Sequence, residues 1–296
     1  MLSSPRGFCA GVVRAVEVVE ICLEKFGPPV YVKHQIVHNP HVVNDLEAKG
    51  AITVETIEEV PPGSTVVFSA HGSPPEDFEK AKERGLRVID AVCPLVTRVH
   101  NEAKKYHREG KQVLLVGHRG HQEVRGTMGQ VDMTLVDDTP GSALPQWPEG
   151  AEVVVLTQTT LSVGDTAQAI EAIKERYSGA LVRNDICYAT TNRQEAVTKM
   201  AALVDMVLVI GAQNSSNCNR LREVAESHGV PSYLVNGPEE IDPQWLAGKE
   251  KVGITSGAST PEVLVEQVIQ ALAPEQVTML TGAEEDVSFT LPKELR

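Results

Sequence analysis

The chain has 296 residues, of which 42% are hydrophobic and 23% are charged, a composition typical of globular rather than disordered proteins. Its 40 acidic and 27 basic residues leave a formal net charge of −13, which disfavours nucleic acid as a partner because the sequence has no basic run. The start of the sequence lacks the features of a signal peptide, and no stretch reaches the roughly 18 apolar residues of a membrane helix. We therefore expect a cytoplasmic protein with no nucleic-acid or membrane partner.

Seven apolar runs, each bounded by glycine or polar residues, predict β-strands. They cover Pro29–Lys33, Thr65–Ser69, Arg87–Val92, Gln112–Val116, Glu152–Thr157, Met206–Ile210 and Lys251–Thr255. Amphipathic helical patterns lie between them, and this alternation is typical of α/β folds with mostly parallel sheets. We expect three small α/β domains, at residues 11–93, 94–189 and 190–280, with residues 1–10 contributing at the centre and a C-terminal tail at 281–296.

The five cysteines are odd in number and widely spaced, which does not fit a disulfide framework. They are Cys9, Cys22, Cys93, Cys187 and Cys218. Apolar residues recur at steps of three and four after Cys9, Cys93 and Cys187, so these three should stand at or just before helix N-termini. Strand-like segments precede Cys93 and Cys187, but only a stub precedes Cys9. Cys22 fits the core face of the first helix, and Cys218 has no counterpart in the other domains.

The three helix-starting cysteines mark an internal repeat. A polar loop follows each one at nearly the same distance, since His38 lies 29 residues after Cys9, His121 lies 28 after Cys93, and Ser215 lies 28 after Cys187. A later strand of each domain ends in a second polar loop: Ala70-His71-Gly72, Thr157-Gln158-Thr159-Thr160 and Ser256-Gly257-Ala258-Ser259. Parallel α/β units carry their working loops at the carboxyl ends of the strands. We therefore expect the cysteines and loops to face one central cavity around a pseudo-threefold axis.

Three converging thiolates would hold a metal centre. Iron–sulfur clusters usually have four cysteine ligands, so three ligands would leave one iron open, and an open position is typical of a catalytic metal. Zinc is an alternative, although the chain has no C-x-x-C pair of the kind that structural zinc sites use.

The loop residues suggest an anionic ligand with many oxygens, such as a diphosphate, because they supply hydrogen-bond donors and positive charge. They are His38, His71, His121, Ser215, Ser216, Asn217 and Ser259. Beside such an anion Glu123 would have its charged form disfavoured, so it could serve as a proton donor. Thr159 could position that carboxyl or a substrate hydroxyl.

Longer motifs in the chain resemble one family. These are Pro5–Val12, Ser69–Gly72, Ala91–Thr97, Gly126–Gln130, Thr157–Ser162, Asp185–Gln194 and Asn214–Asn217. In their residues and their order, these motifs resemble those of the 4-hydroxy-3-methylbut-2-enyl diphosphate reductases over nearly the full length of the chain. The resemblance implies a trefoil of three α/β domains around one [4Fe-4S] cluster, held by Cys9, Cys93 and Cys187 with the fourth iron open to substrate. It also implies that the seven loop residues above hold the diphosphate, and that Glu123 and Thr159 handle the substrate hydroxyl and its protonation.

The implied reaction is the reductive dehydroxylation of (E)-4-hydroxy-3-methylbut-2-enyl diphosphate to isopentenyl and dimethylallyl diphosphate. A ferredoxin, a flavodoxin or a similar protein would donate the electrons. Two alternatives are a non-redox protein that binds a phosphorylated metabolite on the same fold, and a hydrolase with Cys93 or Cys187 as nucleophile. The chain departs from the family pattern at Ser4, Gln213 and Cys218, where we expect Asn, Lys and Ser. Its stretch before Cys9 is also short, which could loosen the first ligand.

Overall fold

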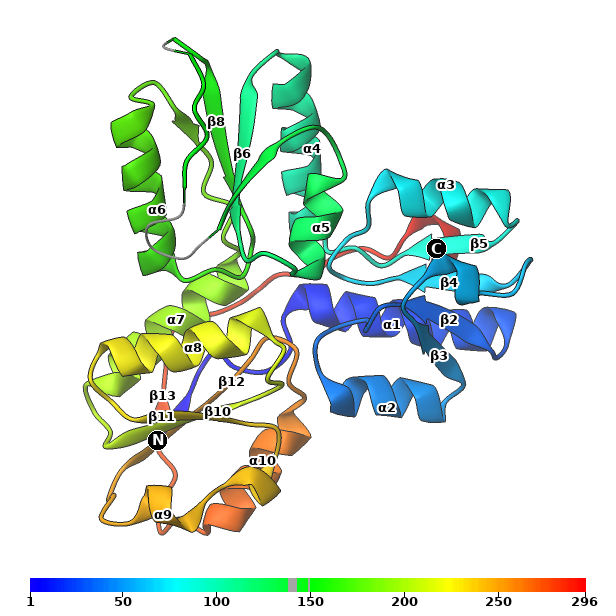
Figure 1. Cartoon of the computed structure of the whole chain (residues 1–296). Coiled ribbons are helices and arrows are strands. Elements are labelled where there is room, and N and C mark those ends of the chain that lie inside the picture. The colour runs from blue at the N-terminus through cyan, green and yellow to red at the C-terminus, as the bar shows by residue number, and fades with distance from the viewer. Residues whose placement is uncertain (138–142, 149) are drawn as a thin grey trace. The chain divides into compact units, whose positions relative to one another are not determined.

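A computed structural model of the chain describes residues 1–137, 143–148 and 150–296 (Figure 1). The described strands form three sheets, and every strand pair in them is parallel. All seven predicted strands are present, with their ends shifted by two residues at most. The α/β prediction with parallel sheets is therefore confirmed.

The three sheets share one strand order. The first runs β3 (Ala51–Val54), β2 (Val30–Lys33), β4 (Thr65–Phe68), β5 (Arg87–Asp90). The second runs β7 (Thr134–Asp137), β6 (Gln112–Gly117), β8 (Val153–Thr157), β9 (Leu181–Val182). The third runs β11 (Ser232–Val235), β10 (Met206–Ile210), β12 (Val252–Ser256), β1 (Leu2–Ser3), β13 (Met279–Leu280). The stub before Cys9 is thus β1, which takes the place that β5 and β9 hold beside the third strand of their sheets.

Six of the described strands were not predicted, and all are short. They are β1, β3, β7, β9, β11 and β13, of two to four residues. The predicted central strands are easier to find because they are buried on both faces and therefore read as continuous apolar runs. Every residue of β4, β8 and β10 is buried, for example.

Helices α1 (Ala10–Phe26), α4 (Pro94–Arg108) and α7 (Tyr188–Ala201) begin at the residues that follow Cys9, Cys93 and Cys187. The predicted place of these cysteines at helix N-termini is therefore confirmed. The other described helices are α2 (Pro40–Ala48), α3 (Pro75–Glu83), α5 (Gln122–Met128), α6 (Val163–Arg176), α8 (Ser216–Ser227), α9 (Pro243–Leu246) and α10 (Glu262–Leu272). None of the helices in the described part of the chain is both long and apolar enough to cross a bilayer.

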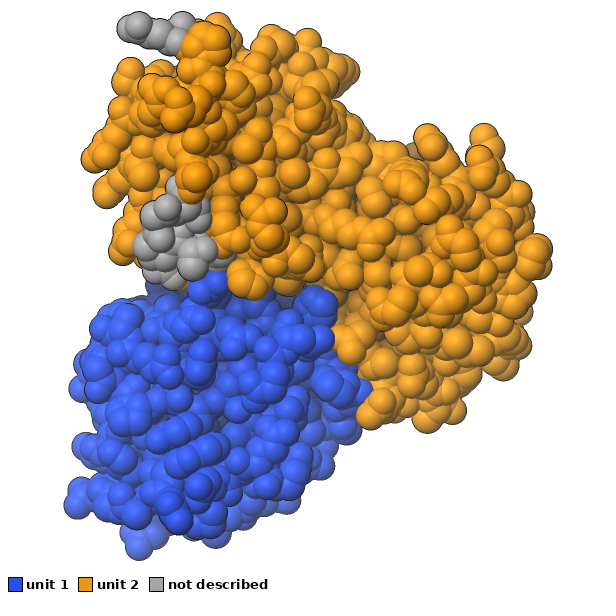
Figure 2. All heavy atoms as spheres, viewed as in Figure 1, with its two compact units in different colours: residues 1–12, 38–42, 188–288 blue, residues 13–37, 43–187, 289–296 orange. Residues whose placement is uncertain are grey.

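The described chain forms two compact units (Figure 2). Unit 1 comprises residues 1–12, 38–42 and 188–288 and contains the third sheet. Unit 2 comprises residues 13–37, 43–187 and 289–296 and contains the first and second sheets. The boundaries of the three expected domains and their arrangement as a trefoil stay predictions.

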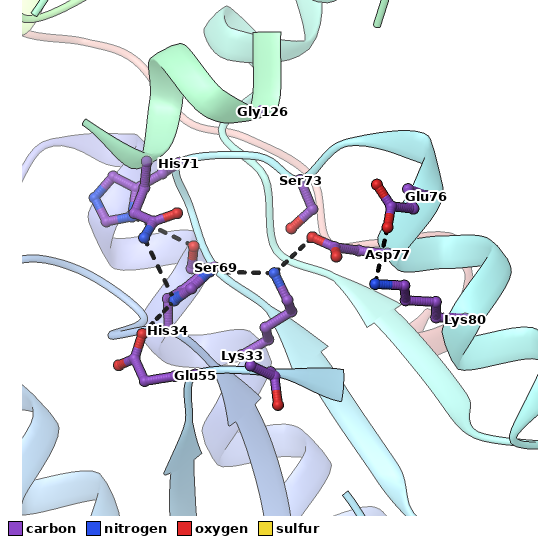
Figure 3. A network of polar contacts seen from close by, with 12 residues as sticks. Lys33, His34, Glu55, Ser69, His71, Ser73, Glu76, Asp77, Lys80 and Gly126 are labelled. Carbon is purple, nitrogen blue, oxygen red and sulfur yellow. Dashed lines mark hydrogen bonds and ion pairs between the residues drawn. The ribbon is translucent and has the colours of Figure 1, made fainter. Parts of the chain in front are cut away.

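A buried ion pair joins the first sheet to its neighbouring helix. Lys33 ends β2, and its Nζ lies 2.5 Å from Oδ2 of Asp77 on α3, with the two side chains only 2% and 6% exposed (Figure 3). Nζ also lies 3.1 Å from Nε2 of His34. Two charges removed from water in this way are tolerated only as a pair.

We expect Asp77→Leu to destabilise the protein by about 3 kcal/mol or more, because it leaves the Lys33 ammonium buried without a counter-charge. Adding Lys33→Met should restore most of the loss. The measurement is the free energy of unfolding in urea for both variants. A single variant as stable as the double variant would show that the pair is not coupled.

Candidate active site

The three helix-starting cysteines make equivalent backbone contacts. Each backbone N–H donates to the carbonyl oxygen of the residue that stands two positions after the third strand of its sheet. The pairs are Cys9 with Ala258 at 3.1 Å, Cys93 with Ala70 at 3.0 Å, and Cys187 with Thr159 at 3.0 Å. The predicted repeat is therefore visible in hydrogen bonds, but each cysteine is bonded to the second polar loop of the preceding repeat, with Cys9 bonded to the loop of the third.

These cysteines also differ from the other two in exposure. Cys9, Cys93 and Cys187 are partly exposed, whereas Cys22 and Cys218 are completely buried. Burial raises the pKa of Cys22 to about 11 and also raises the pKa of Cys218, so neither thiol forms a thiolate readily. A helix N-terminus has the opposite effect and favours the thiolate.

Among the described residues, no group of three or more His, Cys, Asp or Glu side chains lies close enough to hold a single metal ion. A four-iron cluster has a different requirement, because each cysteine binds its own iron. Partly exposed thiols at helix N-termini fit that requirement.

Unit 2 brings together two of the predicted histidines. The rings of His71 and His121 meet edge to face with their centroids 5.8 Å apart. His71 lies in the loop after β4, with Nδ1 3.3 Å from Oγ of Ser69 (Figure 3). His121 caps α5, where its Nδ1 accepts the backbone N–H of Glu123 at 3.2 Å. In the neutral ring this leaves the proton on Nε2, so that nitrogen is a donor.

Glycine at position 126 allows α5 to approach the His71 loop, because a methyl group there would lie 2.7 Å from the carbonyl oxygen of Gly72. Gly72 is itself packed against α4, since a methyl group on it would lie 2.7 Å from Cε1 of His100. Figure 3 shows Gly126 on the helix that lies against this loop. A hydrogen bond also joins the two segments, because Nε2 of Gln130 donates to the carbonyl oxygen of Ser73 at 3.1 Å. The Gly126–Gln130 motif therefore fixes the helix that carries Glu123 against the loop that carries His71.

Glu123 and Thr159 form a buried pair in the same unit. The Thr159 backbone N–H donates to Oε1 of Glu123 at 2.7 Å, and its hydroxyl donates to Oε2 at 2.8 Å. Both residues are buried, at 3% and 4% exposure. Burial raises the pKa of Glu123 to about 7, although the two bonds from Thr159 act in the opposite direction. A carboxyl with this pKa can exchange a proton near neutral pH, as a general acid must.

Unit 1 gathers the remaining predicted residues around the loop after β12. Ser215 caps α8 by accepting the N–H of Cys218 at 3.3 Å. Oδ1 of Asn217 accepts the N–H of Ala258 at 3.0 Å, and the Ser259 hydroxyl donates to the carbonyl oxygen of His38 at 3.0 Å. Ser216 is the first residue of α8. The helix N-terminus carries the positive end of the helix dipole, which favours an anion.

Each unit thus holds half of the predicted set. Unit 1 contains Cys9, His38, Ser215, Ser216, Asn217 and Ser259. Unit 2 contains Cys93, Cys187, His71, His121, Glu123 and Thr159. Asp185 begins the Asp185–Gln194 motif, and its sequence context alone predicts no role for it. It is buried two residues before Cys187, where it accepts the N–H of Thr157 at 3.3 Å, and burial raises its pKa to about 6.

The departures from the family pattern are accommodated locally. The short opening stretch is held at Gly7, whose N–H donates to Oγ of Ser256 at 2.9 Å, in addition to the bond from Cys9. Gln213 is exposed, and its Nε2 donates to the carbonyl oxygen of Leu234 at 2.9 Å. Cys218 fills a space beside Gly211, where a methyl group would lie 2.3 Å from Sγ.

The raised pKa of Glu123 predicts a pH-dependent cost to stability. Between the ordinary pKa of 4.5 and the folded value of about 7, the unfolded chain loses its proton while the folded chain keeps it. The folded state therefore loses stability as the pH rises through this window, and the loss is complete above it. We expect Glu123→Gln to gain stability relative to the parent protein between pH 4.5 and pH 7, measured by urea unfolding at several pH values. A difference in unfolding free energy between the two proteins that does not vary with pH would contradict the raised pKa of Glu123.

The sequence matches the family model described as LytB protein over residues 1–273. It is 54% identical to 4-hydroxy-3-methylbut-2-enyl diphosphate reductase 1 of Rhodopseudomonas palustris, covering 99% of this chain and 98% of that protein. It is 52% identical to the 4-hydroxy-3-methylbut-2-enyl diphosphate reductase of Azoarcus sp., covering 100% and 97%.

Two solved structures are also similar. The E-1-hydroxy-2-methyl-but-2-enyl-4-diphosphate reductase from Plasmodium falciparum has a TM-score of 0.94 and 37% identity, covering 99% of this chain and 95% of that one. A structure of (E)-4-hydroxy-3-methyl-but-2-enyl diphosphate reductase, described as the terminal enzyme of the non-mevalonate pathway, has a TM-score of 0.64 and 35% identity, covering 92% and 98%. With matches of this extent, the chain belongs to the LytB family of 4-hydroxy-3-methylbut-2-enyl diphosphate reductases.

Proposed function

We propose that the chain catalyses the reductive dehydroxylation of (E)-4-hydroxy-3-methylbut-2-enyl diphosphate to isopentenyl diphosphate and dimethylallyl diphosphate. The reaction consumes two electrons and two protons and releases water. Family membership over the full length supports this reaction. The structural observation that carries it is the buried Glu123 carboxyl, held by Thr159 with a pKa of about 7, because loss of a hydroxyl group as water requires a proton donor.

In this proposal Cys9, Cys93 and Cys187 hold one [4Fe-4S] cluster. Their partial exposure, their helix N-termini and their equivalent backbone bonds support the assignment. When bound, the cluster would supply single electrons and, at the iron without a protein thiolate, a Lewis acid. A ferredoxin, flavodoxin or similar cytoplasmic protein would supply the electrons.

The diphosphate would be bound by the hydrogen-bond donors of the predicted polar loops. Unit 1 offers the N-terminus of α8 with Ser215, Ser216 and Asn217, together with His38 and Ser259. Unit 2 offers the ring N–H groups of His71 and His121. Imidazoles that gain a proton beside a diphosphate would strengthen this binding, because each adds a charge-assisted hydrogen bond.

Glu123 would donate the proton that lets the substrate hydroxyl leave as water. The Thr159 hydroxyl holds Oε2 of the carboxyl and can pass a proton between it and a substrate oxygen, because a hydroxyl is both donor and acceptor. The backbone N–H of Thr159 fixes the other carboxyl oxygen. The same residue accepts the Cys187 N–H through its carbonyl group, so the proton donor and a proposed cluster ligand share one anchor.

Anaerobic turnover tests the proposal. The protein is reconstituted with iron and sulfide, mixed with reduced methyl viologen and the substrate, and assayed for viologen oxidation and for five-carbon diphosphate products. We expect substrate-dependent oxidation with both products. A protein with a full four-iron cluster, bound substrate and no turnover would instead support the non-redox binding protein.

The cysteine assignment predicts that Cys9→Ser, Cys93→Ser and Cys187→Ser each lose most of the bound iron and the turnover, because each removes one cluster ligand. Cys22→Ala and Cys218→Ser are the matched controls and should retain both, since these thiols are buried in the core. Iron and sulfide per chain and viologen oxidation are measured for all five. If only one of the three serine variants were inactive, the nucleophile alternative would replace the cluster.

The proton-donor assignment predicts that Glu123→Gln retains the cluster and binds the diphosphate but turns over about 10²–10⁴-fold more slowly, the usual range for a lost general acid. Thr159→Val should share the defect, whereas Thr159→Ser should retain most of the activity because it keeps the hydroxyl. The kcat and KM values of the three variants are compared. Near-normal kcat in Glu123→Gln would remove this residue from the role.

A further inference from the structure

Three arginines occupy the same place in the repeat. Each lies five or six residues after one cysteine, on the helix that begins there. They are Arg14 on α1, Arg98 on α4 and Arg193 on α7. Each side chain contacts the segment just before a different cysteine, and each contact lies within one compact unit.

Arg193 makes the most buried of the three contacts. Its side chain is completely buried, and its Nη2 donates to the carbonyl oxygen of Gly7 at 2.8 Å. Gly7 stands two residues before Cys9. Nη1 donates to the carbonyl oxygen of Ala189 and to Oε1 of Glu285, each at 2.9 Å. The helix after Cys187 therefore holds the loop before Cys9.

Arg14 makes the equivalent contact to the second cysteine. It is 8% exposed, and its Nη1 donates to the carbonyl oxygen of Val92 at 2.9 Å. Val92 directly precedes Cys93. Nε donates to the carbonyl oxygen of Thr290 at 2.7 Å, which fixes the side chain from the other side. The helix after Cys9 therefore holds the loop before Cys93.

Arg98 makes the third contact of this kind, and it is weaker than the other two. Its Nη2 lies 3.6 Å from Oδ1 of Asp185, two residues before Cys187. The Arg98 side chain is 48% exposed, whereas the side chain of Asp185 is only 2% exposed. Solvent screens an exposed ion pair of this kind, so it contributes little.

We propose that Arg14 and Arg193, with a minor contribution from Arg98, are positioning residues for the three cysteines. Each fixes the backbone of the loop that precedes the next cysteine: Arg193 for Cys9, Arg14 for Cys93 and Arg98 for Cys187. A buried guanidinium suits this task because its planar, pre-organised donors lose little freedom on binding a carbonyl group, and a hydrogen bond from a charged donor is stronger than a neutral one. The importance of the three loops for catalysis rests on the proposed function, but the contacts themselves do not.

The first experiment uses the cluster-free protein, so its result does not depend on the cofactor. Alkylation of each cysteine by iodoacetamide is followed by peptide mass spectrometry in Arg14→Met, Arg98→Met and Arg193→Met. We expect Arg193→Met to accelerate alkylation of Cys9 about tenfold and Arg14→Met to do the same for Cys93, because a lost bond to a charged donor shifts a local opening equilibrium by about that factor. Arg98→Met should change Cys187 by no more than about twofold.

The matched control is Arg183→Met. Arg183 is 44% exposed and pairs with Glu102 through two bonds of 3.0 and 2.8 Å, but it contacts no segment adjoining a cysteine in these bonds. Because Arg183 lies only four residues before Cys187, the control applies to Cys9 and Cys93, whose alkylation rates its loss should leave unchanged. If Arg193→Met fails to fold because Glu285 is left without its partner, Arg193→Met with Glu285→Gln removes that charge, and Arg14→Met tests the inference independently.

The second experiment measures retention of the cluster. The reconstituted variants are challenged with EDTA, and bound iron and sulfide are followed with time. We expect Arg14→Met and Arg193→Met to lose iron about 10- to 100-fold faster, the range for removal of residues that orient metal ligands, with partial rescue in Arg14→Lys. If the parent protein bound no cluster but the arginine variants still showed faster alkylation of Cys9 or Cys93, the proposed function would be overturned and the positioning role would stand. Bound cluster with equal alkylation and equal iron loss in all folded variants would overturn the positioning role alone.

Discussion

One backbone hydrogen bond, made three times, fixes the place of each of the three helix-starting cysteines. It runs from a cysteine N–H to a carbonyl two residues beyond a buried strand. In unit 1 the residue that accepts the bond, Ala258, also donates its own N–H to Asn217, and its neighbour Ser259 holds His38. A shift of β12 would therefore move a cysteine together with residues that are proposed to bind the diphosphate. The sheet imposes this coupling, because the carboxyl ends of its parallel strands meet at one edge.

The proton chemistry depends on packing rather than on a neighbouring charge. Burial is the largest cause of the raised pKa of Glu123. The helix that carries this carboxyl, α5, lies close against the His71 loop, and that approach needs glycine at position 126. The two bonds from Thr159 keep the pKa from rising further. The pKa of the carboxyl thus stays near neutral pH, where the group can both give and regain a proton.

Sequence patterns identified the central strands and the helices after the cysteines, because buried runs and three-to-four spacing survive in a single sequence. They did not identify the edge strands β3, β7 or β11, which are only partly buried and therefore need no continuous apolar run, although they did identify β5, which is also a four-residue edge strand. The loop pattern suggested the roles proposed for Glu123 and Thr159, but the family resemblance was needed to single them out. A carboxyl in a loop is usually solvated, and the hydroxyl that holds Glu123 lies 36 positions away in the sequence. Arg14 and Arg193 were missed because a buried arginine looks like a surface arginine in sequence. The one feature of the sequence that could have indicated them is their similar spacing from the cysteines, since each lies five or six residues after one of them.

The place of β1 has a consequence for how the protein is made. Leu2 pairs with Ile254 and with Met279, so β1 is synthesised before the first and second sheets but completes a sheet whose other strands follow them. The first and second sheets can form before that third sheet is complete, because domains synthesised early commonly fold first. The Cys9 loop, in contrast, lacks its partners Arg193 and Ala258 until residue 258 has been translated. Any cofactor that needs Cys9 must therefore be inserted after that point.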